Sequence, residues 1–385
     1  MADHFLVADA FDVHLAVDGV AWPRYATVMM KQTPTRKEMS RARCCRDSSY
    51  DGVFWVCVCT TGVFCRPSCP AKTPQEANVT YALSVQEALL AGYRPCKRCR
   101  PLETDGRPPE WVRALLALAD GYRARRLTDA DLRGAGIDPA RARRYFRDHL
   151  GMTFHAFHRA ARLGGALGKL QRGSRLIDAG LDHGYESDSG FRSAFARQFG
   201  ATPGRSGGVR PIVLRSLESP VGRLELAATE RGVCLLEFGD RRSLPTEMAL
   251  LKKKIGGVVP GTNEHIESMA DELAQYFAGR LTHFATPLEI VGTPFQRRVW
   301  AELCRIPYSR TVSYAEVARR VGRPGAVRAV GRANGTNRIA IAIPCHRVVG
   351  ADGKLCGYGG GLWRKQFLLD VESSSELLPG CQRPT

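Results

Sequence analysis

The sequence predicts a multidomain α+β protein, and three observations lead to this prediction. Two cysteine pairs in basic turns, "TGVFCRPSCPAK" and "RPCKRCR", indicate a small cysteine-centred domain in the first third of the chain. Two similar segments in the middle each have helical periodicity on both sides of a short turn, which predicts an all-α domain. From residue 212 onward, strand-like and then helical patterns predict an α/β subdomain followed by a helical one.

The expected domain boundaries follow changes in composition along the chain. The stretches "ETDGRPPE" and "GATPGRSGGVRP" have the composition of linkers. We therefore expect, in order, an unassigned N-terminal arm (1–40), the cysteine-centred domain (41–102), the helical domain (107–207), the α/β subdomain (212–290), the helical subdomain (293–372) and a tail (373–385).

The composition is that of a globular protein without a membrane partner. A chain of 385 residues, 44% of them hydrophobic, is long enough for two to four domains, and no window is apolar enough to span a bilayer. The first residues carry aspartates and no basic leader, so we expect no secretory signal and a cytoplasmic location. We also expect a monomer.

The net charge points to a polyanionic partner. The formal charge is +18, and residues 107–210 contain 19 Lys and Arg against 10 Asp and Glu, so about half of the excess lies in the helical domain. Such a field attracts phosphate, which favours nucleic acid as the partner. A basic surface without a binding role is the alternative.

The cysteine-centred domain begins with a strand pattern and ends with a short helix. The run "DGVFWVCVCTTG" alternates at strand period, so Cys57 and Cys59 are expected to fill the core from one strand face. The segment "SVQEALLAGYRP" predicts a helix that Gly92 and Pro95 stop.

The two cysteine pairs have the spacing of a metal site. Disulfides are improbable in a reducing compartment, which leaves metal ligands or nucleophiles. Two close pairs joined by a loop suit tetrahedral zinc with four thiolates, and a purely structural zinc site is an alternative to a reactive one. The expected metal ligands are Cys65, Cys69, Cys96 and Cys99.

The stretch "RDSSYDGVFWVCVCTTGVFCRPSCPAK", followed by "AGYRPCKRCRP", resembles the N-terminal zinc domain of the Ada family of bacterial responses to DNA methylation damage. The resemblance implies one Zn²⁺ per chain, structural and thiolate-activating, and makes Cys65 the acceptor of a methyl group from a DNA phosphotriester. The tryptophan-containing helix usual upstream is not recognisable here. The basic residues expected to face DNA from this domain are Arg66, Lys97 and Arg98.

The helical middle resembles the AraC-type DNA-binding domain, most clearly at "GYESDSGFRSAFARQFGATP". A pair of helix-turn-helix units can place one recognition helix in each of two major-groove segments of double-stranded DNA. Gly164, Gly165 and Gly168 lie in the linking helix, and each is expected to cost about 1 kcal/mol relative to Ala and to loosen the spacing of the units. The expected DNA contacts are Arg141, Arg143, Arg144, Arg147, Ser187, Ser189, Arg192 and Arg197.

The run "RIAIAIPCHRVVG" is expected to be a strand that leads into Pro-Cys-His-Arg-Val, which resembles the active-site motif of the O6-alkylguanine-DNA alkyltransferases. The similarity extends over residues 212–372 and implies a ribonuclease-H-like α/β subdomain and a winged-helix-like helical subdomain. It makes Cys345 the nucleophile that takes an alkyl group from O6-alkylguanine and from O4-alkylthymine. His346, oriented by Glu372, would draw off its proton through a water.

Further roles follow from matching positions in the same family. Tyr314 would donate a proton to the departing guanine, and Asn337 would tie the recognition helix to the active-site loop. Arg328 would enter the duplex and fill the space of the flipped base. The base pocket is expected to be lined by Val348, Tyr358 and Gly359.

Three function classes compete for the whole chain. A single-turnover methylated-DNA–protein-cysteine methyltransferase requires Cys65 and Cys345, a pure transcription regulator requires only the helix-turn-helix units, and a structural zinc protein requires neither cysteine as nucleophile. The intact Pro-Cys-His-Arg-Val motif argues against the last two as complete accounts. The resemblance implies alkylated DNA, promoter DNA and RNA polymerase as partners. An alkyltransferase with a helix-turn-helix targeting module, but without a methylation-dependent switch, is the alternative.

Overall fold

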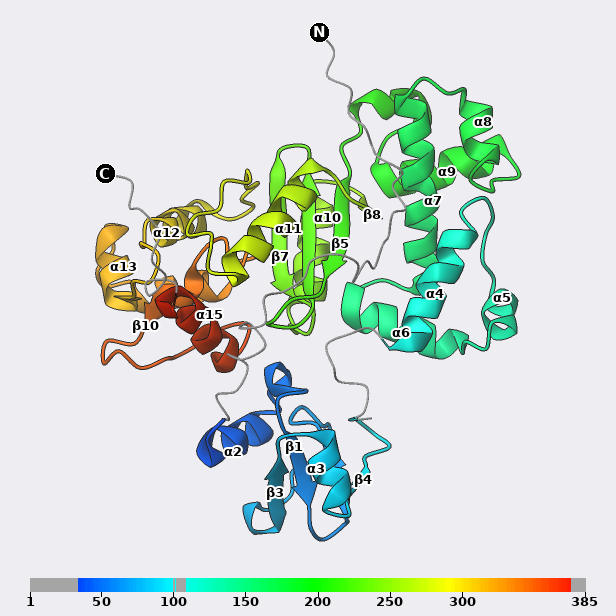
Figure 1. Cartoon of the computed structure of the whole chain (residues 1–385). Helices are drawn as coiled ribbons and strands as arrows, with labels where there is room; N and C mark the ends of the chain where they lie inside the picture. Colours follow the sequence, from blue (N-terminus) through cyan, green and yellow to red (C-terminus); the bar gives the residue numbers. More distant parts are fainter. Residues whose placement is uncertain (1–33, 100, 102–108, 375–385) are drawn as a thin grey trace.

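The computed structural model describes residues 34–99, 101 and 109–374, which form a small zinc-type domain, a helical domain and a two-part C-terminal domain (Figure 1). The expected arm up to residue 33, the linker at 102–108 and the tail from residue 375 lie outside the described residues. No helix in the described ranges has the length and apolar character needed to cross a membrane.

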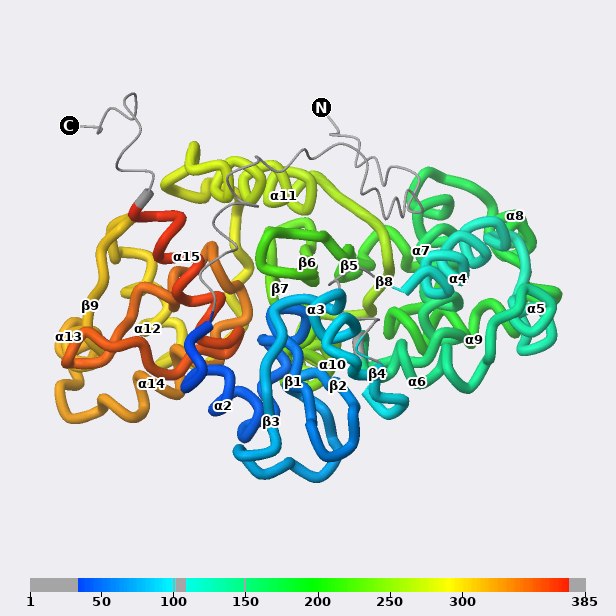
Figure 2. Tube along the Cα trace, turned by 60° about the horizontal axis from the view of Figure 1, so that its bottom comes forward, coloured from blue at the N-terminus to red at the C-terminus, as the bar shows by residue number. Residues whose placement is uncertain are grey.

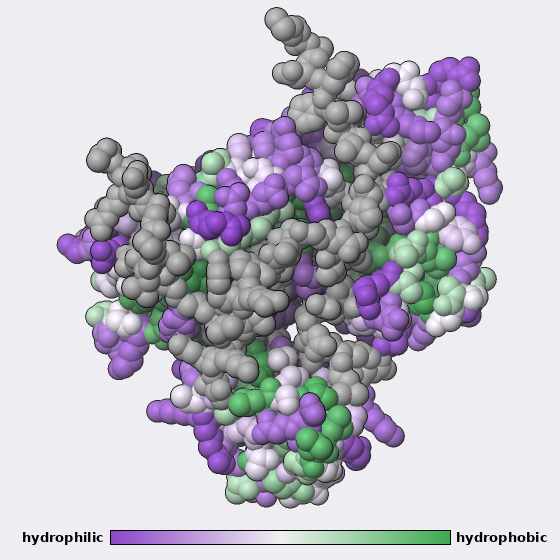
Figure 3. All heavy atoms as spheres, viewed as in Figure 1, coloured by the Kyte–Doolittle hydropathy of each residue, from purple (hydrophilic) through white to green (hydrophobic). Residues whose placement is uncertain are grey.

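The cysteine-centred domain is built on a four-stranded sheet with the order β3-β1-β2-β4. The central strands β1 and β2 pair antiparallel, and β4 adds to β2 in parallel. Hydrophobic side chains gather around α3 (Figure 3), where Leu83, Leu89 and Leu90 are exposed. The elements are α2 (Arg36–Cys45), η1 (Ser48–Tyr50), β1 (Trp55–Val58), β2 (Val63–Cys65), η2 (Glu76–Asn78), β3 (Val79–Ala82), α3 (Val85–Leu90) and β4 (Arg94–Pro95).

Helix α2 begins before residue 41, where the sequence led us to expect the start of this domain. Thr35 and Glu38 form a capping box at its N-terminus, each side chain accepting from the other residue's backbone N–H. Met39 and Ala42 are buried in a cluster with residues of β1 and β3. A further expectation was wrong, because Cys57 is buried on β1 whereas Cys59 lies beyond the strand end and is exposed.

The helical domain contains the two expected helix-turn-helix units. The first unit is α5–α6 and the second is α8–α9, and the long helix α7 connects them. Each recognition helix ends at a glycine in the left-handed region, Gly151 (φ 67°) and Gly200 (φ 69°). The elements are α4 (Glu110–Gly121), α5 (Asp129–Gly134), α6 (Pro139–Leu150), α7 (Phe154–Gln171), α8 (Leu176–Leu181), α9 (Asp188–Phe199) and η4 (Pro203–Gly208).

The linking helix α7 is continuous through its three glycines. That they loosen the spacing of the two units stays a prediction. A Cβ built on Gly164 would lie 3.1 Å from Cβ of Val259 in β8, which is tighter than ordinary contact. The glycine therefore allows α7 to pack closely against the neighbouring α/β subdomain, and this packing offsets its low helix propensity.

The α/β subdomain has a four-stranded sheet with the order β7-β6-β5-β8. Strands β5, β6 and β7 form an antiparallel meander, and β8 pairs with β5 in parallel. Helix α11 lies beside this sheet (Figure 2), and its buried apolar residues share one cluster with those of β6 and β7. The elements are β5 (Ile212–Leu217), β6 (Leu224–Thr229), β7 (Gly232–Phe238), α10 (Leu244–Lys254), β8 (Val258–Pro260) and α11 (Glu264–Phe277).

The helical subdomain shares one hydrophobic core with the α/β subdomain. Buried residues of β6, β7 and α11 contact those of α12, α14 and α15 in a single cluster that includes Cys345. A short parallel pair, β9 with β10, joins the segment before α13 to the active-site segment. The elements are α12 (Pro294–Cys304), β9 (Val312–Ser313), α13 (Tyr314–Arg320), α14 (Val327–Gly335), η5 (Cys345–Arg347), β10 (Val348–Val349) and α15 (Leu362–Ser374).

The apolar run before Cys345 was expected to be a strand, and this expectation was wrong. Residues 338–344 form a buried loop whose only ladder contact in the described chain is a bridge between Leu236 and Ile339. Ile341 has φ 68°, in the left-handed region that β-branched residues rarely adopt. The run is apolar because it fills the shared core, and its backbone is held by the bridge to Leu236 of β7 and by hydrogen bonds to the Asn337 side chain.

Candidate functional site

The four predicted metal ligands lie together at the end of the zinc-domain sheet. Cys65 ends β2, and the parallel pairing of β2 with β4 brings the segment of Cys96 and Cys99 beside it. Cys69 completes the group, and the four Sγ atoms lie within 4.8 Å of one another. Thiolates bound to zinc in a tetrahedron at about 2.3 Å are roughly 3.8 Å apart, so the cluster fits this metal. The four cysteines are grouped as the ligands of a metal site would be.

The knuckle between Cys65 and Cys69 is fixed by a buried carboxylate. Asp51 Oδ1 accepts a hydrogen bond from the Ser68 backbone N–H (3.1 Å), and Asp51 Oδ2 accepts one from the Ser68 hydroxyl. Arg66 Nη1 lies 3.6 Å from Asp51 Oδ2. Burial raises the pKa of Asp51 to about 6, although Ser68 and Arg66 oppose this shift. The Arg66 backbone N–H points to Cys99 Sγ at 3.4 Å. The turn thus presents Cys65, which is half-buried, in a fixed orientation.

The basic residues predicted to face DNA from this domain differ in their surroundings. Lys97 and Arg98 are exposed in the loop between two of the metal ligands. Arg66 is half-buried and paired with Asp51. Cys44, Cys45 and Cys59 are exposed and lie outside the cluster.

The sulfur of Cys345 is buried and accepts a hydrogen bond from a side-chain amide. Cys345 is 5% exposed, and Asn337 Nδ2 donates to its Sγ at 3.1 Å. The same amide group donates to the Ile343 carbonyl (2.9 Å), and its oxygen accepts from the Ile339 N–H (3.0 Å). Burial raises the pKa of the Cys345 thiol, and the bond from Asn337 opposes that shift. Asn337 therefore both shapes the loop and stabilises a thiolate within it.

A fully buried ionic cluster lies directly behind this cysteine. His346 Nε2 contacts Glu372 Oε1 at 2.8 Å, and the exposure of both side chains is 0%. Glu372 also accepts from Arg347 (Nε to Oε2, 2.9 Å), from Tyr276 Oη (3.0 Å) and from the Ser309 N–H (3.0 Å). Burial alone would raise the pKa of Glu372, but the bonds from His346 and Arg347 outweigh it and hold the pKa at about 2.

The carboxylate fixes the protonation state of the imidazole. Glu372 is ionised at neutral pH, so His346 Nε2 carries the proton that it donates. Burial lowers the pKa of His346, which keeps the ring neutral. Its buried Nδ1 has no hydrogen-bond partner among the described residues, and in this tautomer that atom is an acceptor.

The predicted pocket residues surround the same cysteine. Tyr314, at the start of α13, points its hydroxyl to the Gly357 carbonyl at 3.2 Å, and burial raises its pKa to about 12. Val348 is fully buried, and Tyr358 has a buried hydroxyl without a partner among the described residues. Lys365 Nζ donates to the carbonyls of Val348 (2.5 Å) and Cys356 (3.0 Å) and so joins the two sides of the loop.

Helix α14 leads from solvent toward the segment that contacts Cys345. Arg328 lies in its first turn and is exposed, whereas Val330 and Ala333 on the other face are buried. Gly331 lies against the Tyr314 ring: a Cβ built on Gly331 would lie 3.9 Å from Cδ1 and Cε1 of Tyr314. The helix ends at Gly335, two residues before Asn337.

The predicted contacts of the helix-turn-helix units fall into two groups. Arg141 stacks on Trp111 (4.4 Å to the ring centroid), and Arg143 pairs with Asp129 at 2.8 Å, so both are half-buried and engaged within the domain. Ser187 caps α9, and Arg192 pairs with Asp188. The remaining predicted residues are exposed on the recognition helices: Arg144, Arg147, Ser189 and Arg197.

Several residues around Cys345 were not predicted from the sequence. Arg347 stands inside the quoted motif but had no assigned role. Lys365 had a detectable signal, because it lies at helical spacing from the buried Leu368 and Glu372, where a charge is unusual. Arg241, which contacts the active-site segment from the loop after β7, and Glu237, which pairs with Arg241, have no local signal.

Comparison with known protein families matches most of the chain. Residues 38–102 match the metal binding domain of Ada, and residues 132–206 match a helix-turn-helix domain. The 6-O-methylguanine DNA methyltransferase family matches twice, with its ribonuclease-like domain at residues 212–290 and its DNA binding domain at residues 294–374.

Individual relatives agree with these matches. The chain is 35% identical to the bifunctional transcriptional activator/DNA repair enzyme Ada of Escherichia coli over 86% of this chain and 94% of that protein. It is 35% identical to the regulatory protein ada of Salmonella typhimurium over 86% and 95%. Its C-terminal part is 47% identical to the methylated-DNA–protein-cysteine methyltransferase of Mycobacterium leprae over 43% of this chain and 95% of that protein. The chain therefore belongs to the Ada family of bifunctional transcriptional activator and DNA repair proteins.

Proposed function

We propose that this protein removes alkyl groups from DNA by transferring them irreversibly to two of its own cysteines, and that one transfer switches on binding to promoter DNA. Cys345 takes the alkyl group of O6-alkylguanine, and of O4-alkylthymine, whereas Cys65 takes the methyl group of a backbone phosphotriester. The observation that carries the proposal is the Asn337 bond to Cys345 Sγ at 3.1 Å beside the buried His346–Glu372 pair.

The transfer to Cys345 needs a thiolate and an exit for its proton. His346 Nδ1 is the acceptor for that proton, through a water, because Nε2 is committed to Glu372. The thiolate displaces the base, so that an S–C bond forms as the O6–C bond breaks. The departing guanine takes a proton from the Tyr314 hydroxyl. The alkylated cysteine is a thioether and is not regenerated, so each site acts once.

The alkylated base must leave the duplex to reach a buried sulfur, which costs a few kcal/mol. Arg328 is suited to occupy the vacated space, because it is exposed on the helix that leads to Asn337. The flipped base would lie against Val348, Tyr358 and Gly359.

The four-cysteine site would hold one zinc ion per chain with Cys65, Cys69, Cys96 and Cys99 as ligands. Bound zinc keeps the sulfurs deprotonated and therefore nucleophilic at neutral pH. Cys65 is the methyl acceptor, and methylation removes one negative charge from the cluster. The positive charges near the site would attract it to the DNA phosphate backbone; they are Arg66, Lys97 and Arg98.

The helix-turn-helix units would supply sequence recognition on double-stranded promoter DNA, with Arg144, Arg147, Ser189 and Arg197 as base or phosphate contacts. Arg141, Arg143, Ser187 and Arg192 would support the recognition helices through their contacts within the domain. We place the protein in the cytoplasm as a monomer that recruits RNA polymerase. The alternative is an alkyltransferase with a targeting module and no switch.

Peptide mass spectrometry tests the two acceptors directly. The protein is exposed to duplexes that contain either O6-methylguanine or methylphosphotriesters, and each cysteine peptide is examined for a methyl group. We expect methylation of Cys345 with the first duplex and of Cys65 with the second. Methylation of any other cysteine in place of these two would overturn the assignment.

A further inference from the structure

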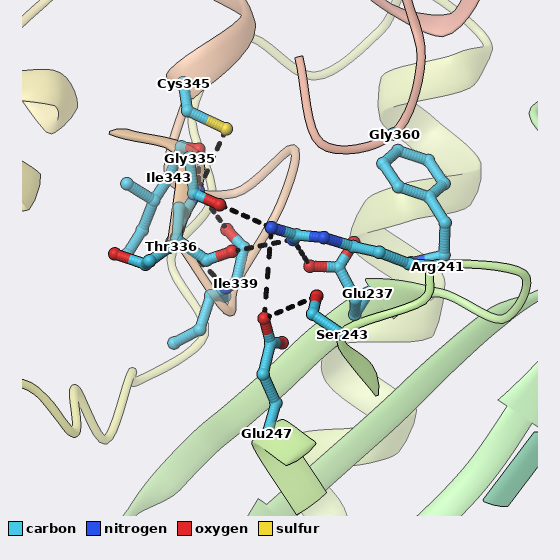
Figure 4. A network of polar contacts seen from close by, with 12 residues as sticks. Glu237, Arg241, Ser243, Glu247, Gly335, Thr336, Ile339, Ile343, Cys345 and Gly360 are labelled. Carbon is cyan, nitrogen blue, oxygen red and sulfur yellow. Dashed lines mark hydrogen bonds and ion pairs between the residues drawn. The ribbon is translucent and has the colours of Figure 1, made fainter. Parts of the chain in front are cut away.

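The hinge between helix α14 and the active-site loop, residues 335–337, is bound by an arginine from the α/β subdomain. Arg241 follows β7, and its guanidinium donates to the carbonyls of Asn337 (3.2 Å, from Nη1) and Gly335 (from Nη2). Gly335 is the last residue of α14, and Asn337 contacts the Cys345 sulfur. Figure 4 shows the guanidinium reaching from the loop after β7 to this segment.

A buried carboxylate holds that arginine in place. Glu237 at the end of β7 is fully buried and pairs with Arg241 Nη1, while its other oxygen accepts from the Phe238 N–H at 2.9 Å. Glu247 of α10 lies 3.9 Å from Arg241 Nη2. The Arg241 side chain is 11% exposed, so its fork is presented to the hinge with little freedom to reorient.

The same guanidinium supports the base-pocket loop. A Cβ built on Gly359 would lie 2.7 Å from Arg241 Cζ, so the loop backbone packs directly on the guanidinium plane. Arg241 therefore contacts two backbone segments near Cys345, the hinge and the glycine-rich loop. Both contacts come from the α/β subdomain, outside the Pro-Cys-His-Arg-Val motif.

We propose that Arg241, held by Glu237, is a positioning residue for alkyl transfer: it fixes the hinge backbone from which Asn337 reaches the Cys345 sulfur. This inference rests on the proposed role of Cys345. It assigns the α/β subdomain a direct part in the chemistry of the helical subdomain, in addition to completing the shared core.

The charges around Cys345 give the proposal a readout that simple loss of structure does not produce. Arg241 and Lys365 favour the thiolate, whereas Glu237 disfavours it. The other ionisable groups that face the site are Tyr314 of α13, Tyr358 of the pocket loop and the neutral His346 with its Glu372–Arg347 pair. Removing Arg241 should raise the apparent pKa of alkyl transfer, and neutralising Glu237 should lower it. A loosened fold would not shift the apparent pKa of alkyl transfer in opposite directions in the two variants.

The experiment uses the full-length protein and a duplex with one O6-methylguanine, in single-turnover reactions at saturating DNA over a range of pH. The variants are Arg241→Met, Arg241→Lys and Glu237→Gln. Arg223→Met is the matched control, because Arg223 is also 11% exposed and pairs with a buried glutamate of the same sheet, Glu225, and with Tyr145. The reaction amplitude counts folded, reactive molecules, and the rate reports on positioning.

We expect Arg241→Met to slow transfer by about tenfold or more, since small misplacements of reacting groups have effects of this size or larger. Its affinity for DNA should change less than threefold or so, because Arg241 faces the hinge and not the duplex. Arg241→Lys should keep the pH profile but transfer at an intermediate rate, because an ammonium cannot bind both carbonyls as a fork. If Arg241→Met does not fold, the other two variants carry the test.

Three results would overturn the proposal. They are an unchanged rate in Arg241→Met, an equal loss of rate in Arg223→Met, and shifts of the pH profile in the same direction for Arg241→Met and Glu237→Gln. Cys345→Ala is included to separate the two levels of inference. If that variant still demethylates guanine, the proposed acceptor is wrong; if it is inactive while the arginine variants behave as wild type, only the role of Arg241 is wrong.

Discussion

The carboxylate of Glu372 contacts His346 Nε2 at 2.8 Å, and both side chains are completely buried. Arg347 donates to the same carboxylate, which makes Glu372 the shared counter-charge of two neighbouring residues. From the sequence, Glu372 was expected to act through His346 rather than by touching DNA. The structure adds a second task, the neutralisation of a buried guanidinium.

The first prediction concerns acid stability. The pKa of Glu372 is lowered from 4.5 to about 2, so its contribution to the free energy of unfolding is full above pH 4.5 and is lost as the pH falls through 2. A shift of this size corresponds to on the order of 3 kcal/mol. Urea unfolding of wild type should therefore weaken more steeply below pH 4.5 than that of Glu372→Gln. Parallel pH profiles would contradict this role.

The same variant should also slow alkyl transfer at neutral pH. Glutamine does not hold the imidazole in the Nε2–H tautomer as an ionised carboxylate does, so the thiol proton loses its acceptor. Because Glu372 is buried, DNA affinity should be nearly unchanged. The rate is measured per reactive molecule, since removing one partner of a buried ion pair typically costs about 3–5 kcal/mol of stability.

A second prediction concerns the metal. Cys69→Ala should reduce the zinc content below one ion per chain and abolish phosphotriester repair. The alanine side chain cannot bind the metal, so three thiolates remain where four are needed. Cys44→Ala and Cys45→Ala are matched controls, since these exposed cysteines lie outside the cluster. Zinc content is measured by elemental analysis of the purified proteins. Retention of one firmly bound zinc in Cys69→Ala would argue against the ligand set.

A third prediction separates the arginines of the first recognition helix. Arg144→Ala and Arg147→Ala should weaken promoter binding, and each should reduce the slope of log K against log salt by about one if it contacts a phosphate. Arg143→Ala removes the pair with Asp129 and should lower the thermal stability of the domain instead. Binding titrations at several salt concentrations, together with thermal melts, distinguish the two effects. Equal effects of all three variants on binding alone would be inconsistent with this division.

The sequence was sufficient for the fold class and the family, and it predicted the four cysteines that the structure brings together, because these depend on short spacings and on family resemblance. It was insufficient where contacts join distant segments. The run before Cys345 has strand composition, but its backbone is bonded to the Asn337 side chain and follows a buried loop. Gly164 suggests a weak helix until its packing on Val259 is known.

The contribution of Arg241 and Glu237 illustrates the same limit more strongly. Both are ordinary charged residues at the end of a strand, and nothing within ten residues of them suggests a role at the active site. The partners of Arg241 in the other subdomain, Gly335 and Asn337, are nearly one hundred positions away and become its neighbours only when the two subdomains pack. Periodicity and motif spacing do not detect contacts of this kind.

A fourth prediction tests the switch. Methylation of Cys65 removes a negative charge close to bound phosphates, so the modified protein should bind its promoter more tightly, with the largest difference at low salt. Base preference should not change, because it resides in the helix-turn-helix units. Affinity is measured against salt before and after reaction with a methylphosphotriester, in a Cys345→Ala background. Equal affinities at every salt concentration would favour an alkyltransferase without a switch.

The central claim is that two cysteines in separate domains accept alkyl groups from different positions in DNA. The most direct measurement compares Cys345→Ala with Cys65→Ala, counting labelled methyl groups transferred from each kind of lesion to each protein. The account predicts that Cys345→Ala loses guanine repair and retains phosphotriester repair, that Cys65→Ala shows the reverse, and that wild type stops at one methyl per site. Guanine repair by Cys345→Ala, or repeated turnover without added thiol, would contradict it.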